Sequence, residues 1–142
     1  IFTASTNKGL AFSEIGKVAS GGELSRLMLA IKVALSKTKS TSCVIFDEID
    51  TGIGGATAEA VGKSLSELGN NVQVISITHQ PQVASKAQNH YIVEKESGRT
   101  STKISVRKLN AKESNEEIAR MLSGENVTKE ARAAALKLKL VN

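Results

Sequence analysis

Apolar residues recur along this chain with two spacings, one typical of helices and the other typical of strands. After Ser20, a spacing of three and four residues predicts an amphipathic helix. Its apolar positions are Leu24, Leu27, Met28, Ile31 and Leu35. Ser20 and Glu23 match a capping box, in which each side chain satisfies the backbone amide of the other residue. We therefore expect a helix that begins at Ser20.

Two short apolar runs with a helical stripe between them form the next pattern. The run Cys43–Phe46 is continuously apolar, as expected of a strand buried on both faces. Val72–Thr78 is a second β-rich run. The stripe between them ends at Gly69-Asn70, and its members are Ala58, Val61, Leu65 and Leu68. These segments predict a βαβ unit, whose crossover is nearly always right-handed and makes the two strands parallel.

Polar residues follow both predicted strands. Asp47-Glu48 comes directly after the first strand, and Thr78-His79 ends the second. Parallel strands end at the same edge of a sheet, and open parallel sheets bind ligands beyond that edge. Two acids and a histidine are therefore expected where a ligand would lie.

The segments on either side of this unit are shorter. Residues 1–18 lack sustained periodicity and are interpreted as a strand or loop lead-in. Pro81 suits the first turn of a short helix. Tyr91–Glu96 and Thr102–Leu109 flank Ser97-Gly98-Arg99, which predicts a β-hairpin.

Two helices are expected at the end of the chain. The first begins at Ser114, with Glu117 completing a second capping box, and ends near Gly124. The second runs from about Thr128 through an alanine-rich segment. The whole pattern predicts one α/β domain over residues 1–142, with a parallel βαβ core, flanking helices, a β-hairpin and the terminal helices.

Composition narrows the class of function. The chain has 142 residues, of which 40% are hydrophobic, enough for one domain with a modest core. Aromatic residues make up only 3% and Trp is absent, which argues against a nucleic-acid module built on aromatic stacking. The single cysteine, Cys43, excludes an internal disulfide or a cysteine zinc site and suits a reducing compartment, so we expect a cytoplasmic protein. No apolar run reaches the roughly 20 residues of a membrane helix, and no membrane partner is expected.

The formal charge of +5 is unevenly distributed. Residues 1–42 carry +4, from six Lys and Arg against two acids, whereas residues 43–84 carry −4, from one Lys against five acids. Residues 85–108 return to +4. A moderate attraction to polyanions follows, although a well-solvated surface explains the same charges.

Three small groups of residues suggest phosphate chemistry. A helix that begins at Ser20-Gly21-Gly22 offers free backbone amides and a positive dipole end to an anion. Asp47 and Glu48 suit magnesium phosphate chemistry, in which one carboxylate holds Mg²⁺ through water and the next orients an attacking water. His79 is placed to contact a terminal phosphate. Each group alone is more often a plain helix cap, a polar strand end or a loop residue, so their order and spacing carry the hypothesis.

In that order, the motifs resemble those of ATP-binding-cassette ATPases. Val18–Arg26 is similar to the signature motif of that superfamily, Val44–Glu48 to its Walker B strand, Asp50 to its D-loop aspartate and His79 to its switch histidine. Three segments point to a smaller group within this superfamily. They resemble the RecN-like family of bacterial DNA repair proteins, within the SMC-like group. The segments are Ser-Gly-Gly-Glu-Leu-Ser-Arg, Phe-Asp-Glu-Ile-Asp-Thr-Gly-Ile-Gly-Gly and Thr-His-Gln-Pro-Gln-Val-Ala.

The resemblance implies a role for each of the motif residues. Glu48 would be the general base or water-positioning carboxylate, Asp47 the Mg²⁺ partner, and His79 the γ-phosphate contact. The signature motif would cap an ATP held by the opposite subunit of a homodimer, acting in trans through Ser20, Gly21, Gly22 and Glu23. Asp50 would help to couple the two nucleotide sites.

One motif of this family is missing from the chain. The only Gly-Lys-Ser is Gly62-Lys63-Ser64, but Thr57 stands where a Walker A loop needs its first glycine, and the tripeptide lies within a predicted helix. Members of this family carry Walker A in an N-terminal segment, separated by coiled-coil arms. The chain, which begins at Ile1 without Met, is therefore expected to be the C-terminal lobe of an ATPase head. Alone it should hydrolyse ATP negligibly and expose apolar surface that the N-terminal half would cover.

Two other functions stay open. A transporter ATPase carries Walker A about a hundred residues before its signature motif and more often has Gln where this chain has Glu23. A basic module that only binds DNA or a protein would use Asp47 and Glu48 structurally, but the joint presence of Glu48, Asp50 and His79 argues against it.

Double-stranded DNA is an expected partner, with its contact surface among the later basic residues. These are Lys86, Lys95, Arg99, Lys103, Arg107 and Lys108. Strand alternation would divide the hairpin members between two faces, and solubility explains them about as well.

Overall fold

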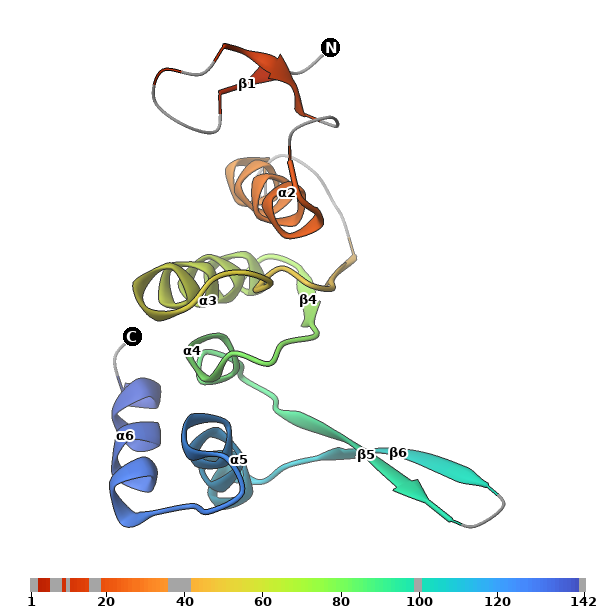
Figure 1. Cartoon of the computed structure of the whole chain (residues 1–142), viewed down its shortest axis with the longest axis vertical. Coiled ribbons are helices and arrows are strands. Elements are labelled where there is room, and N and C mark those ends of the chain that lie inside the picture. Colours follow the sequence, from red (N-terminus) through yellow and green to blue (C-terminus); the bar gives the residue numbers. More distant parts are fainter. Residues whose placement is uncertain are drawn as a thin grey trace.

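The computed structural model describes residues 3–5, 9, 11–15, 19–35, 42–98 and 101–140. Along the chain the elements are β1 (Thr3–Ala4), β2 (Ser13–Glu14), α2 (Gly21–Leu35), β3 (Cys43–Phe46), α3 (Gly55–Gly69), β4 (Gln73–Ser76), α4 (Pro81–Ala84), β5 (Tyr91–Ser97), β6 (Thr102–Lys108), α5 (Ala111–Ser123) and α6 (Lys129–Leu140). Figure 1 shows α2, α3, α4 and α5 following one another down the molecule, with the β5–β6 hairpin pointing away from them. None of the described helices combines the length and apolar character that crossing a bilayer requires.

The predicted βαβ unit is confirmed. Strands β3 and β4 pair in parallel, with Cys43 opposite Gln73 and Phe46 opposite Ser76, and α3 connects them. The predicted stripe of α3 is the buried face of that helix, through Ala58, Val61, Leu65 and Leu68. It packs on Phe46 and Leu29 in the main core. Strand β4 is shorter than the predicted run, because only Gln73–Ser76 pairs with the four residues of β3.

Strand β3 is not buried on both faces as predicted. Val44 packs against the main core, but Ile45 is 64% exposed. On β4, Ile75 lies opposite Ile45 and is also exposed. The reason is that α3 covers one face of this pair of strands, while no other described residue covers the opposite face.

Helix α2 forms where the spacing predicts it, but the apolar stripe that defines the prediction faces outward. Its residues Leu24, Leu27, Met28, Ile31 and Leu35 are 36–45% exposed. The buried positions are Gly22 and Leu29, and Val33 packs on the main core beside them. The larger apolar face of α2 therefore has no covering element among the described residues.

The chain ends as a projecting hairpin and a closed pair of helices. Strands β5 and β6 pair antiparallel, from Tyr91 opposite Lys108 to Ser97 opposite Thr102, which confirms the predicted hairpin. Helices α5 and α6 pack on each other around Ile118, Ala119 and Ala135. At the other end of the chain, β1 and β2 form a short antiparallel pair.

Helix α5 begins earlier than predicted. Its N-cap is Asn110, whose side chain accepts a hydrogen bond from the Glu113 amide (2.9 Å), while Glu113 accepts one from the Asn110 amide (2.8 Å). Ser114, the predicted start, lies inside the helix and is buried. The predicted start of the last helix is close to correct, because the Thr128 hydroxyl accepts a hydrogen bond from the Ala131 amide.

Candidate functional site at the edge of the parallel strands

The two predicted acidic and histidine segments meet at one edge of the β3–β4 pair. Because these strands run in parallel and in register, the segments that follow Phe46 and Ser76 leave the sheet side by side. Asp47 and Glu48 are exposed after β3, and His79 is exposed after β4. The prediction of a shared edge is confirmed.

Asp50 joins these two segments. Its side chain is 1% exposed, and one carboxylate oxygen accepts hydrogen bonds from the Thr78 hydroxyl and from the amides of His79 (3.0 Å) and Gln80 (3.2 Å). A buried carboxylate is stable only when such donors replace water. Asp50 therefore holds the loop after β3 against the loop after β4.

His79 lies at the open side of this junction. Its Nδ1 is 3.4 Å from the same Asp50 oxygen, while 68% of its side chain is exposed. Gln80 adds a further link, because its side-chain amide donates to the Ile53 carbonyl at 2.9 Å. One nitrogen of the imidazole therefore lies beside the Asp50 carboxylate, while most of the ring is open to solvent.

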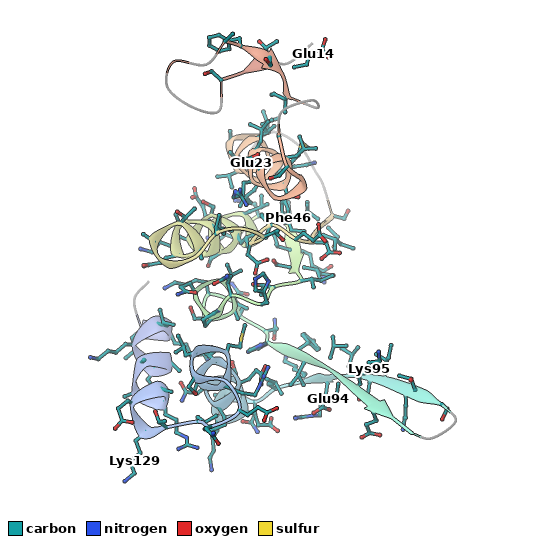
Figure 2. All side chains as sticks on the ribbon, in the orientation of Figure 1. Glu14, Glu23, Phe46, Glu94, Lys95 and Lys129 are labelled. Carbon is teal, nitrogen blue, oxygen red and sulfur yellow. The ribbon has the colours of Figure 1, made fainter. Side chains whose placement is uncertain are left out.

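The start of α2 has the predicted capping box. The Ser20 amide donates to the Glu23 carboxylate at 2.8 Å, and the Glu23 amide donates to the Ser20 hydroxyl at 3.3 Å. The hydrogen bond from the Ser20 amide is the main reason that the pKa of Glu23 lies below its usual range. Figure 2 labels Glu23 on α2.

Helix α2 begins directly against the turn that follows β3. A Cβ added to Gly21 would lie 3.8 Å from the Glu48 carboxylate. A Cβ on Gly22 would lie 3.1 Å from the Thr51 carbonyl and 3.3 Å from that of Glu48, closer than nearly all real Cβ contacts. Arg26, one turn further along, donates from Nη1 to the carbonyls of Ile49 (3.1 Å) and Thr51 (3.2 Å).

Glu48 has a backbone conformation that is rare for its residue type. Its φ is +57°, and it is the one residue other than glycine with positive φ in the described part of the chain. Such a conformation costs on the order of 1–3 kcal/mol and persists only where the surrounding contacts hold it. Gly22 and Arg26 contact this turn from α2, and Asp50 binds it to the loop after β4.

Arg26, Thr78 and Gln80 also belong to this site, although no pattern in the sequence predicts a role for them. Thr78 and Gln80 flank the predicted histidine, so their positions were visible, but their common partner Asp50 is about 30 residues away. Arg26 lies one helical turn after Gly22 on the face of α2 that meets the turn. That face could not be recognised from the spacing, because the stronger apolar stripe lies on the opposite side.

The carboxylates at this edge fit a magnesium ion that takes few ligands from the protein. The described residues contain no group of three or more His, Cys, Asp or Glu side chains arranged to hold a metal. Magnesium in phosphate sites typically keeps water and phosphate oxygens and takes only one or two carboxylates. Asp47 and Glu48 offer oxygen ligands of that kind, both exposed.

The residues of the predicted basic surface have different neighbours. The Lys86 ammonium donates to the Leu138 carbonyl at 3.1 Å, and Arg107 pairs with Glu113 at 2.7 Å. In the hairpin, Figure 2 shows Lys95 and its neighbour Glu94 on opposite sides. Lys103 lies opposite Glu96, whereas Lys108 shares a face with Lys95. Arg99 lies outside the described residues.

Lys63 does not lie in a phosphate-binding loop. It belongs to the middle of α3 and pairs with Glu59 at 3.0 Å, one helical turn earlier. This contact contributes to a pKa of Glu59 below its usual range. The interpretation of Gly62-Lys63-Ser64 as a chance match is therefore consistent with its place in the fold.

The chain is similar in sequence to one known protein family and to several of its members. Residues 10–102 match the family "RecF/RecN/SMC N terminal domain". The chain is 51% identical over 138 residues to the DNA repair protein RecN of Rickettsia felis, 48% identical to that of Xylella fastidiosa and 43% identical to that of Vibrio cholerae. These matches cover 96–97% of this chain but 25% of each relative, so the chain spans about a quarter of their length.

A solved structure shares the fold. It comes from work described as "Structural biochemistry of ATP-driven dimerization and DNA stimulated activation of SMC ATPases". The TM-score is 0.54 at 23% sequence identity, over 83% of this chain and 70% of that one. The likeness confirms the predicted fold class, a partial P-loop NTPase fold of the α/β type with a parallel strand pair and flanking helices.

Proposed function

Since the chain belongs to the RecF/RecN/SMC N terminal domain family, we propose that it is the C-terminal lobe of the ATPase head of a RecN-like protein that acts in DNA double-strand-break repair and recombination. The observation that carries this proposal is the junction of three motifs: the start of α2, the acids after β3 and the histidine after β4 meet around Asp50. The names of the relatives support DNA repair as the process.

Within this head, Glu48 is the proposed general base that orients or deprotonates the attacking water. Asp47 is proposed to bind Mg²⁺ through water, and His79 to contact the γ-phosphate. All three side chains are exposed at one edge, so a bound nucleotide can reach them. ATP and Mg²⁺ would supply the phosphoryl group and the neutralising charge, while the protein positions the water and stabilises charge.

The signature residues are proposed to serve the nucleotide of a second subunit. Ser20, Gly21, Gly22 and Glu23 form the start of a helix whose dipole suits a phosphate. The amides of Ser20 and Glu23 are bound within the capping box, so the amides of Gly21 and Gly22 are the ones proposed to face the phosphate. Asp50 is proposed to couple the two sites. Because its carboxylate is occupied by donors of its own chain, this coupling would act through the shape of the loop that Asp50 holds.

The N-terminal half of the same protein, which would carry Walker A, is the proposed cover of the exposed apolar faces. Ile45 and Ile75 form one such face and the outer stripe of α2 forms another. Apolar surfaces of this kind mark interaction sites, and the relatives are about four times as long as this chain. The remaining proposed partners are a second copy, through ATP-sandwiched heads, and double-stranded DNA, in the cytoplasm at the nucleoid.

The test is the substitution Glu48→Gln in the full-length protein. Loss of a general base typically lowers turnover by about 10²–10⁴-fold, and ATP-dependent dimers should persist because binding is intact. Turnover and dimerisation are measured by phosphate release and by sedimentation. Glu67→Gln removes an equal charge from an exposed position near the end of α3 and should change neither.

Unchanged turnover of Glu48→Gln would refute the role of Glu48, and a full-length protein without ATP-dependent turnover would refute the function. The chain of residues 1–142 alone should be inactive. Robust Mg²⁺-dependent turnover of this chain, abolished by Glu48→Gln, would contradict the view that the N-terminal half is required.

A further inference from the structure

We propose that Arg26 is a positioning residue that fastens the signature helix α2 to the turn bearing Glu48 and Asp50, so that helix and turn move as one body. The proposal rests on the proposed function, because it assigns the mechanical link between the two motifs of that head. It concerns contacts within one chain, whereas the signature motif itself was proposed to act on a partner's nucleotide.

The guanidinium of Arg26 joins α2 to the turn after β3. One nitrogen of Arg26 donates to two carbonyls, those of Ile49 and Thr51, which flank Asp50. These residues are 23 and 25 positions away along the chain, so the contact joins two separate elements. Hydrogen bonds from a charged donor are stronger than neutral ones. A half-buried guanidinium therefore stabilises this turn against α2 specifically.

Gly22 of α2 lies close to the same turn. A Cβ at this position would lie 3.0 Å from Arg26 Nη1 and 3.1 Å from the Thr51 carbonyl. A larger residue here would require the Arg26 guanidinium, the turn or α2 to shift by a few tenths of an ångström. The second glycine of the motif therefore has a role inside its own chain, besides any contact with a phosphate.

The far side of the same turn is bound to the loop after β4. Asp50 accepts hydrogen bonds from the amides of His79 and Gln80, which ties the turn to the loop after β4. A continuous path of contacts thus runs from α2 through Arg26 and the turn to His79. Glu48, with φ of +57°, lies within this path and depends on it for its conformation.

A functional consequence follows for a two-headed ATPase. When α2 is displaced by a nucleotide bound in trans, the turn moves with it, and Glu48 and His79 of the same chain shift toward or away from their own nucleotide. Coupling of this kind needs a contiguous element with two arrangements that both sites bias. Arg26 is the contact through which the signature helix would act on its own catalytic edge.

The experiment uses two variants of the full-length protein. Arg26→Met keeps the apolar stem and removes the nitrogen that donates both hydrogen bonds. Arg26→Lys keeps a positive charge and a single donor nitrogen. Lys32→Met, further along the same helix, is the matched control. Four quantities are measured: ATP affinity, ATP-dependent dimerisation in a Glu48→Gln background, turnover, and hydrogen exchange of residues 47–53 and 77–80 without nucleotide.

For Arg26→Met we expect turnover and the dimerisation constant to fall about tenfold, the scale of a lost hydrogen bond to a charged group. ATP affinity should change less than twofold, since the first contact with ATP does not involve Arg26. Exchange should rise in both loops, Arg26→Lys should recover part of each effect, and Lys32→Met should resemble the parent protein.

Two outcomes overturn the proposal. Unchanged hydrogen exchange in the two loops of Arg26→Met excludes the mechanical link, whether or not the protein hydrolyses ATP. Faster hydrogen exchange with unchanged dimerisation and turnover would show that Arg26 stabilises the turn but does not couple the signature helix to it. A parent protein that neither binds ATP nor dimerises refutes the proposed function instead, and the exchange measurement still decides whether Arg26 fastens the turn.

Discussion

Helix α2 and the helix pair α5–α6 are all amphipathic, yet they bury their apolar residues to opposite extents. Between α5 and α6, Ile118, Ala119 and Ala135 are fully buried. On α2 the residues of the larger stripe, among them Leu27 and Ile31, stay more than a third exposed. The contact between α5 and α6 is closed, although Leu136 and Leu140 of α6 stay exposed, whereas the larger stripe of α2 has no covering element among the described residues.

Polar contacts close the helix pair as well. Arg132 of α6 binds the Glu116 carboxylate through both Nε and Nη2, at 2.6–3.1 Å. Lys139 donates to the Ser114 hydroxyl at 2.9 Å. The Arg132 side chain also holds the pKa of Glu116 below its usual range. Elements that find their partners nearby in sequence are satisfied by this chain alone.

The two regions differ in how far their apolar side chains are covered. The α5–α6 pair buries its contact residues, whereas α2 and the outer face of β3–β4 leave apolar side chains exposed. The region that holds the candidate site is therefore also the region where the proposed cover by the N-terminal half can be tested.

The largest expected effect is on the closed pair. Ile118→Ala leaves a cavity among fully buried neighbours and should lower the free energy of unfolding by about 2–5 kcal/mol. Ile45→Ala, at a residue that is 64% exposed, should cost less than about 0.5 kcal/mol in this chain alone. Denaturant unfolding measures both changes in the free energy of unfolding. Equal losses of stability in the two variants would contradict the difference between the two regions.

A smaller effect is expected from the outer stripe of α2. Leu27→Gln together with Ile31→Gln should reduce self-association of this chain and lower the stability of the full-length protein by about 1–3 kcal/mol, because the same side chains become buried there. Sedimentation and thermal unfolding provide the two measurements. Leu140→Gln, at a position that is 79% exposed on α6, is the control. A full-length protein that tolerates the double substitution would show that nothing covers α2.

The smallest expected effect is a pH dependence of the closed pair. Burial lowers the pKa of His90 below its usual value of 6.5, with Glu117 opposing the shift and Lys139 adding to it. The neutral ring, 3.0 Å from the Ser114 hydroxyl, contributes stability above pH 6.5. This contribution is lost as the pH falls below 6.5, because the unfolded chain then binds the proton first.

The melting temperature should accordingly decline between pH 7.5 and pH 5.5, and His90→Gln should remove that part of the decline. Thermal unfolding followed by circular dichroism across this range is the measurement. If the His90→Gln protein keeps the full slope, the dependence arises elsewhere and His90 does not sense pH in the helix pair.

Short-range features were predictable because their causes lie within a few residues. The capping box of Ser20 and Glu23, the buried stripe of α3 and the shared edge of Asp47 and His79 all follow from spacing and strand topology. The start of α5 shows the limit of such reasoning. Asn110 with Glu113 and Ser114 with Glu117 are both valid capping boxes, four residues apart.

The tertiary structure selects the first of these boxes. Leu109 is buried and its amide donates to the His90 carbonyl, so the chain turns into α5 directly after the hairpin. Ser114 then falls inside the helix, where its hydroxyl contacts both His90 and Lys139. No local pattern could rank these two starts.

The sequence by itself determined the order of the elements from α2 to α6 and the residues that meet at the edge of the β3–β4 pair, because hydrogen-bonding periodicity and the parallel crossover are local or topological constraints. Only the tertiary structure decided which face of α2 lies inward and that Arg26 reaches the carbonyls beside Asp50. The physical reason is distance along the chain. Burial and long-range hydrogen bonds depend on which surfaces meet, and that depends on every element packed around them.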